Sequence, residues 1–175
     1  MGIGFADYGL ERFQITPLII HSSDILAGMP GWSSSGAFSI GANRAQFIPF
    51  TLSEMVVIKR MSIVNGASVS GNVDVGIYDQ AGNRLVSIGG VAQGPINSAQ
   101  IFDIADTQLA AGRYYLAVVL SGTAGLCGLS GFTGGCVYAG VKEMAAAYPL
   151  PDTATFADNL IRSFIPHLAA MLTAA

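Results

Sequence analysis

The side chains that most often carry catalysis are few and scattered in this chain. Its two histidines, His21 and His167, stand apart from each other and from any cysteine pair, so neighbours in sequence build no metal site. Residues 128–131 read Gly-Leu-Ser-Gly, one position short of the Gly-x-Ser-x-Gly turn that presents a nucleophilic serine. We therefore expect no enzyme, no catalytic residue, no cofactor and no metal, with both histidines in structural roles.

Four aspartates in the middle of the chain are the next candidates: Asp74, Asp79, Asp103 and Asp106. Two carboxylates placed together could serve glycosidic hydrolysis or bind calcium. On strands and in turns, however, single carboxylates more often solvate an exposed face or cap the turn. We expect this second role, and we predict that Asp74 is solvated.

Aromatic side chains offer the other candidate site. A flat amphipathic ring can stack on a sugar or anchor a protein partner. Trp32 and Tyr78 are the candidate contacts with a glycan or a partner. The competing role for such rings is the core or a subunit interface.

The chain has two cysteines, Cys127 and Cys136, too few for a disulfide scaffold and without metal-ligand spacing. A local bridge and two free thiols both fit the sequence.

Charge is scarce for a chain of 175 residues. Only 11% of the residues are charged, compared with roughly 25% in an average domain, while 51% are hydrophobic. A folded monomer of this size would carry about one charge per 400 Å² of surface, so we expect a homo-oligomer that hides apolar area. The net charge of −3 argues against nucleic acid as a partner. Glycines interrupt the longest uncharged run, between Arg113 and Lys142, so membrane insertion is not expected.

The clearest structural signal is a period of two in residues 73–79. Val73, Val75 and Ile77 fall on one face, which we predict to be buried. A Gly-Asn turn and the apolar run that follows complete a hairpin from about Val73 to Ile88. Further strands are predicted at 45–51, 55–64, 99–104 and, as a central strand, 114–120. The predicted fold class is all-β: an antiparallel β-sandwich or jelly roll with an extended N-terminal arm and a C-terminal tail.

The predicted organisation has three parts. Residues 1–36 form an N-terminal arm and loop, 37–145 the β-sandwich domain, and 146–175 the C-terminal tail. Within the domain, the Gly-rich segment 121–136 repeats glycine every third residue, which fits either a mobile loop or a three-residue packing helix.

The C-terminal tail has apolar residues at helical spacing, but Pro166 opposes a helix. A helix and an extended tail lying on a neighbouring subunit both remain open. The terminal segments carry apolar side chains that the domain does not need, so we expect them to anchor the protein to its neighbours. The candidate anchoring residues are Phe5, Tyr8, Phe164 and Ile165.

Several strings between about residues 40 and 120 resemble a β-sandwich module of virion structural proteins from tailed bacteriophages. Residues 43–50 read Asn-Arg-Ala-Gln-Phe-Ile-Pro-Phe, and 70–79 read Ser-Gly-Asn-Val-Asp-Val-Gly-Ile-Tyr-Asp. The likeness continues in 81–87, Ala-Gly-Asn-Arg-Leu-Val-Ser, and in 112–117, Gly-Arg-Tyr-Tyr-Leu-Ala. No catalytic residue belongs to it.

The resemblance implies a virion structural protein, assembled in the host cytoplasm, whose partners are other phage proteins of the capsid or tail. A capsid decoration or head-surface subunit that stabilises the particle exterior is the leading expectation. The alternative is a tail-appendage module that binds host-surface glycan. The resemblance also favours a trimer over a dimer.

Overall fold

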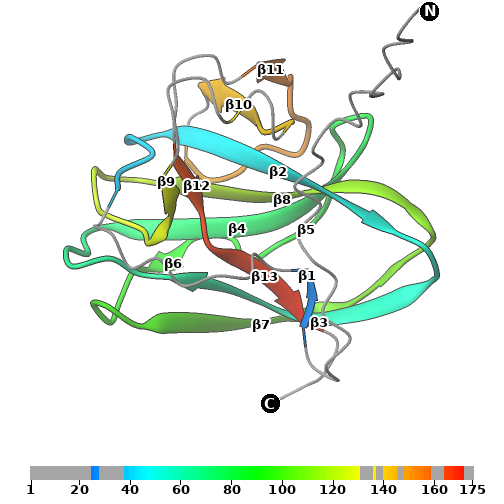
Figure 1. The fold of residues 1–175 in the computed structure, drawn as a ribbon, viewed down its shortest axis with the longest axis horizontal. Helices are drawn as coiled ribbons and strands as arrows, with labels where there is room; N and C mark the ends of the chain where they lie inside the picture. The colour runs from blue at the N-terminus through cyan, green and yellow to red at the C-terminus, as the bar shows by residue number, and fades with distance from the viewer. Residues whose placement is uncertain are drawn as a thin grey trace, which may run out of the picture.

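The computed structural model describes residues 25–27, 38–130, 136, 140–145, 148–158 and 164–171. These residues are nearly all in strands or the turns between them, and every ladder between strands is antiparallel (Figure 1). The predicted all-β class is therefore confirmed. In the part of the chain so described, no helix is long and apolar enough to cross a membrane.

The strands are β1 (Ile25–Ala27), β2 (Arg44–Leu52), β3 (Val56–Val64), β4 (Asn72–Asp79), β5 (Arg84–Ser87), β6 (Val91–Ala92), β7 (Ala99–Leu109), β8 (Gly112–Leu120), β9 (Gly128–Ser130), β10 (Lys142–Ala145), β11 (Ala157–Asp158), β12 (Phe164–Pro166) and β13 (Leu168–Met171). All the strands expected between residues 45 and 120 are present. The strand expected at 99–104 is longer than predicted, since β7 continues to Leu109.

The larger sheet has seven strands in the order β11-β10-β2-β8-β4-β5, with β6 also paired to β4. Strand β8 lies between β2 and β4, so the predicted central strand is confirmed: Ala117 is opposite Phe47 on one side and Gly76 on the other. The predicted hairpin is also confirmed, because β4 and β5 pair around a tight turn with one bulge beside Tyr78. In Figure 1 this sheet occupies the upper part of the view.

The second sheet has four strands in the order β1-β13-β3-β7, and β7 lies at the bottom of Figure 1. The inward-facing side chains of both sheets meet in one hydrophobic cluster, which we call the main core. Val73, Val75 and Ile77 are buried there as predicted. From the four-stranded sheet the main core receives Ile58, Met61, Ile63, Phe102, Leu109, Leu168 and Ala170.

The end of the chain corrects the prediction of a separate tail. Residues 164–171 form strands, not a helix, and β13 lies inside the four-stranded sheet between β1 and β3. Phe164 and Ile165 are only 5% and 7% exposed in the main core, so their predicted role as anchors to a neighbour is wrong. Since their apolar area is already buried within the chain, little of it is left for a partner.

The short ladder between β12 and β9 explains the sequence around Pro166. Proline cannot donate to a ladder, and Pro166 stands at the end of β12, opposite Gly128. The next residue restores the pairing, because the His167 amide donates to the Cys127 carbonyl at 2.9 Å. A Cβ on Gly128 would lie 2.1 Å from the Ile165 carbonyl oxygen, so only glycine permits this close approach.

The described part of the Gly-rich segment does not form the three-residue helix. Its backbone instead pairs with other segments of the same chain. The Gly125 amide donates to the Ser68 carbonyl, and the backbone groups of Leu126 and Phe38 exchange two hydrogen bonds. Cys127 and Cys136 are thiols and do not form a disulfide with each other. Each thiol points to a backbone carbonyl, that of Asn65 at 3.4 Å for Cys127 and that of Phe164 at 3.3 Å for Cys136.

Candidate functional site: a strap and its polar clamp

The outer face of the seven-stranded sheet is covered by residues 148–158, which we call the strap and whose last two residues, Ala157 and Asp158, join the edge of the same sheet as β11. Side chains of the strap and of this face form a second hydrophobic cluster apart from the main core. Phe47 is at its centre: its ring meets the Tyr78 ring edge-on at 5.1 Å and the Phe156 ring at 5.0 Å. The buried members of this second core are Ala45, Phe47, Tyr78, Ala117, Val119, Leu150 and Ala154.

Tyr78 lies in this second core with 0% of its surface exposed, so of the two roles considered for it the structure supports the core and not the contact with a glycan. No face of the ring is left to stack on a sugar. Its hydroxyl donates to the Pro151 carbonyl at 2.5 Å, which satisfies the one polar group of the side chain. Burial raises the pKa of Tyr78 far above its usual value, and the nearby Arg84 charge only partly opposes that rise.

Asp74 is also 0% exposed, so the prediction that it is solvated was wrong. The strap and the β5–β6 turn enclose its carboxylate and supply hydrogen-bond donors in place of water. Oδ1 accepts from the Ser87 hydroxyl at 2.8 Å and the Gly89 amide at 3.2 Å, and Oδ2 accepts from the Leu150 amide at 3.0 Å. A buried carboxylate is tolerable only with such partners, and bonds to a charged acceptor are the stronger ones.

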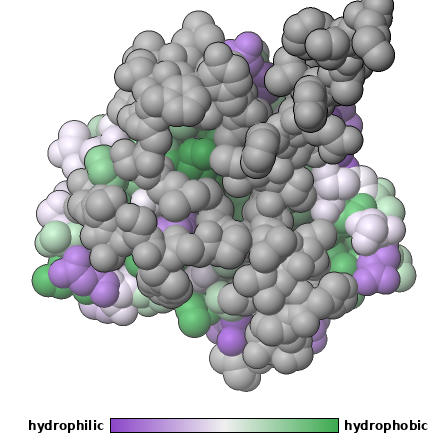
Figure 2. Space-filling view, viewed as in Figure 1, coloured by the Kyte–Doolittle hydropathy of each residue, from purple (hydrophilic) through white to green (hydrophobic). Residues whose placement is uncertain are grey.

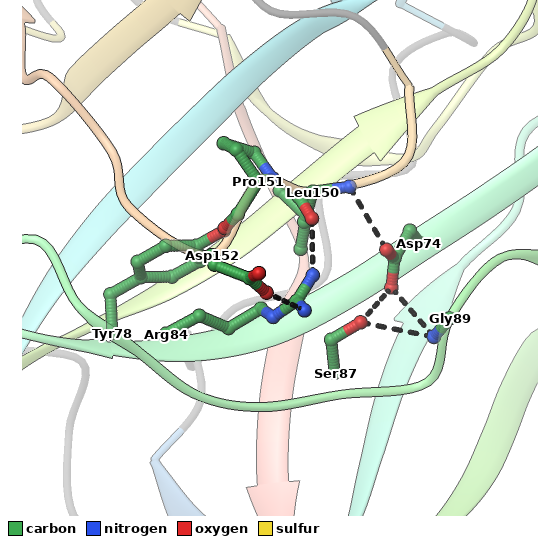
Figure 3. A network of polar contacts seen from close by, with 8 residues as sticks. All are labelled: Asp74, Tyr78, Arg84, Ser87, Gly89, Leu150, Pro151 and Asp152. Carbon is green, nitrogen blue, oxygen red and sulfur yellow. Dashed lines mark hydrogen bonds and ion pairs between the residues drawn. The ribbon is translucent and has the colours of Figure 1, made fainter.

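Arg84 completes the attachment at the start of β5. Its guanidinium donates to the Leu150 carbonyl and to the Asp152 carboxylate, and its own amide donates to the Asp152 carbonyl at 2.8 Å. We call Asp74, Tyr78 and Arg84, all from the β4–β5 hairpin, the polar clamp. Figure 3 shows the three side chains reaching the strap at Leu150, Pro151 and Asp152.

Glycines let the strap approach the hairpin closely. The Ala154 amide donates to the Gly82 carbonyl at 2.8 Å, and a Cβ on Gly82 would lie 2.4 Å from the Ala154 oxygen. Gly82 also has a φ of 91°, which other residues rarely adopt. At the other end, Tyr148 lies so close to Gly90 that a Cβ there would overlap its hydroxyl. Burial, and then the Asp74 charge, raise the pKa of Tyr148.

The clamp is built for attachment. The carboxylate of Asp74 and the hydroxyl of Tyr78 are both buried and both engaged by the chain itself, so neither faces a space in which a substrate could lie. Within the described ranges, no three or more His, Cys, Asp and Glu side chains are grouped so that they could hold a metal ion. The expectations of no enzyme activity, no cofactor and no metal stay predictions.

A second buried polar group joins loops at one end of the sheets. The Gln93 side-chain amide donates to Asn65 Oδ1 and to the Gly125 carbonyl, each at 3.0 Å. Asn65 in turn donates to Gln100 Oε1 at 3.0 Å, which also accepts from the Gly94 amide. These three amides were not predicted as a group, because their positions in the chain, 65, 93 and 100, follow no recognisable spacing.

Of the other candidate residues from the sequence, three have no described position, and the aspartates do not come together. Trp32, Phe5 and Tyr8 lie outside the described residues. The four aspartates do not form one site: Asp74 is in the clamp, and Asp79 accepts from Asn83 in the hairpin turn. On the other sheet, Asp103 pairs with Arg60 and Asp106 with Lys59. The hydrogen bonds from Asn83 hold the pKa of Asp79 below its usual range.

Comparison with known proteins identifies no relative. No family model, no curated protein and no solved structure matches this chain. The resemblance to phage virion modules therefore remains an expectation from the quoted strings, and the function has to be argued from the chain itself.

Proposed function

We propose that this protein is a structural subunit of a bacteriophage virion, most directly a capsid decoration protein that binds and stabilises the particle exterior. We also infer that its two packed sheets form a β-sandwich, the fold that the resemblance implies. The proposal has two supports: the resemblance of residues 40–120, and a surface that is poor in charge and carries large apolar side chains.

The exposed apolar side chains are the observation that carries the proposal. Six large hydrophobic residues of the described surface are at least 37% exposed, although the chain already buries two separate hydrophobic clusters. Figure 2 shows hydrophobic patches among the hydrophilic ones where described residues are visible at the rim of that face. These side chains lie outside both hydrophobic clusters, so they are available for contact with other chains. The six residues are Met55, Val57, Leu85, Val91, Ile96 and Ile101.

The structure also gives a reason to favour a structural role over a catalytic one. The buried polar side chains of the clamp hold one part of the chain on another, and their donors and acceptors are used within the chain. Such an arrangement stiffens a subunit, which benefits a protein that must keep its shape in an assembly.

Immunogold labelling of purified phage particles, combined with mass spectrometry of their proteins, tests the proposal. We expect the protein in the particles at a fixed copy number, with the label on the head. Absence of the protein from washed particles would overturn the virion role. Label on the tail, together with binding of the purified protein to host-surface glycan, would replace decoration with the tail-appendage alternative.

A further inference from the structure

One end of the two sheets carries no charged side chain on its loops. Strands β3 and β8 end there, and β4 and β7 begin there, so three segments of the chain meet: residues 65–72, 88–98 and 121–127. None of the three contains Asp, Glu, Lys, Arg or His. We call these three segments the uncharged end, which lies at the left of Figure 1, opposite the turn between β2 and β3.

The opposite end of the sheets mixes apolar and charged groups. Met55, in the turn between β2 and β3, is 63% exposed, so apolar exposure alone does not distinguish the two ends. The charges do, because each turn at the opposite end contains or adjoins one. These charged residues are Glu54, Asp79, Arg84 and Arg113. Charged side chains protect a surface from association, and the uncharged end lacks that protection.

Apolar side chains are accessible on the uncharged end. Ile96, in the loop before β7, is 55% exposed, and Val91 of β6 is 37% exposed. Small apolar residues of the same segments are exposed as well, namely Ala67, Ala92 and Pro95. A partner that covers this end would therefore remove apolar area from water without having to strip water from a charge.

Buried amides hold the three segments of the uncharged end together. The Gln93 side chain takes one group from each, because its amide donates to Asn65 Oδ1 and to the Gly125 carbonyl. Backbone hydrogen bonds add to this: the Asn97 amide donates to the Gly66 carbonyl at 2.9 Å, and the Gly66 amide donates to the Gly125 carbonyl at 3.1 Å. A surface that is already ordered loses little conformational entropy when a partner covers it.

We propose that the uncharged end is the surface by which the protein attaches to the phage particle, where it lies on an uncharged and largely apolar area of the shell protein. The inference rests on the proposed virion function, which does not by itself say which surface faces the shell. With no cation, this end has nothing to attract phosphate or an anionic membrane, and its three segments contain no aromatic ring to stack on a sugar. A charged partner surface would lose its water and gain no opposite charge, so the complementary surface is uncharged.

Loading of the purified protein onto phage particles that lack it tests the inference. Quantitative mass spectrometry of washed particles measures the occupancy. The affinity of the parent protein should change by less than about twofold between about 0.05 and about 0.5 M NaCl, because no charge takes part in the contact. A steep fall with salt would mean that a charged surface makes the contact and would overturn the inference. No loading of the parent at all would overturn the virion role, and the inference with it.

A matched pair of lysine variants locates the contact. Ile96→Lys should weaken loading by about tenfold or more, because the new charge would be buried against an apolar surface. Met55→Lys is the control at the opposite end and should load as the parent does. Thermal melting confirms that both variants fold. Parental loading of Ile96→Lys, or an equal loss in both variants, would exclude the uncharged end and leave the virion role standing.

A second pair of variants adds charge with almost no change in shape. Asn97→Asp keeps a residue that tolerates the positive φ of 48° at this position, and it should weaken loading because one anion enters the contact. Gln80→Glu makes the same exchange of amide for carboxylate at an exposed position of the turn between β4 and β5, and it should not affect loading. If Asn97→Asp loads normally but loses self-association in sedimentation velocity, the uncharged end binds a second copy of the chain and the proposed shell contact is wrong.

Discussion

The two faces of the seven-stranded sheet are buried in different ways. The inner face is covered by another sheet and is sealed mainly by apolar side chains, including Val73, Val75 and Ile77, with Gln46 of β2 as a buried polar exception. The outer face is covered by the strap, and there Asp74 and Tyr78 of the same strand are equally buried. In a sheet, the backbone amides and carbonyls of neighbouring strands form hydrogen bonds with each other. An irregular segment such as the strap instead brings unpaired amides and carbonyls, which need side-chain partners. The polar residues on the outer face of β4 are those partners.

The largest effect is expected on the inner face. Val75→Asp would put an unpaired charge among apolar side chains and should lower the free energy of unfolding by about 4 kcal/mol or more. Chemical denaturation followed by circular dichroism measures the change. Leu85→Asp on the exposed surface is the control. If the two variants have equal stability, the assignment of the inner face is wrong.

The next effect should come from the clamp. Asp74→Ala leaves the buried Leu150 amide without its acceptor and removes one of the two acceptors of the Gly89 amide, and we expect a loss of about 3 kcal/mol. Hydrogen exchange should show the loss locally, with the Leu150 amide exchanging faster than amides of β8. Asp79→Ala, on the same strand but only partly buried, should cost less than about 1 kcal/mol. A similar cost for both would mean that the carboxylate of Asp74 does not hold the strap.

Removing one hydroxyl should have a smaller effect. Tyr78→Phe keeps the ring packing but leaves the Pro151 carbonyl without its donor, for a loss of about 1.5 kcal/mol. The raised pKa of Tyr78 adds a pH test. Between the usual pKa near 10 and the raised value, only the unfolded chain ionises, so the parent should lose stability as the pH rises above about 10. Tyr78→Phe should lose less over the same range, and parallel pH profiles would contradict the burial of this hydroxyl.

The smallest effect concerns His167, beside β13. Burial lowers its pKa, so the unfolded chain binds a proton more readily than the folded one. The free energy of unfolding should therefore decline slightly as the pH falls below about 6.5, the ordinary histidine value. His167→Gln should flatten that decline, as thermal melts at pH 7.5 and 5.5 would show. An unchanged slope in the variant would assign the decline to other groups.

The contrast between the two faces also explains which features of the fold could be predicted from the sequence. The alternation in 73–79 identified the inner face correctly, because alternation reports local strand geometry. It could not reveal that residues 148–158 return to cover Asp74 and Tyr78, since nothing local to β4 encodes so distant a partner. Gly76 carries a partial signal, because a Cβ there would lie 2.7 Å from the Val86 carbonyl oxygen of β5 and 3.0 Å from Leu150 Cδ1, so a missing side chain on an apparently exposed face marks a close approach.

The prediction for the C-terminal residues was wrong for a different reason. Apolar residues fall on both faces of 164–171, so the same sequence satisfies a helical period and a strand period. Leu168 and Ala170 face the main core, while Ala169 and Met171 face outward. Pro166 was the correct argument against a helix, but it could not show that the strand belongs to this chain's own sheet.

The position of β13 has a consequence for how the protein is made. This strand lies between β1 and β3, so the four-stranded sheet stays in two pieces until residues 168–171 have emerged from the ribosome. The β4–β5 hairpin, whose partners are close in sequence, can form much earlier, whereas pairing across long stretches of chain is slow. During synthesis the nascent chain therefore carries an open β3 edge and an incompletely covered main core, both of which are prone to wrong contacts with other chains.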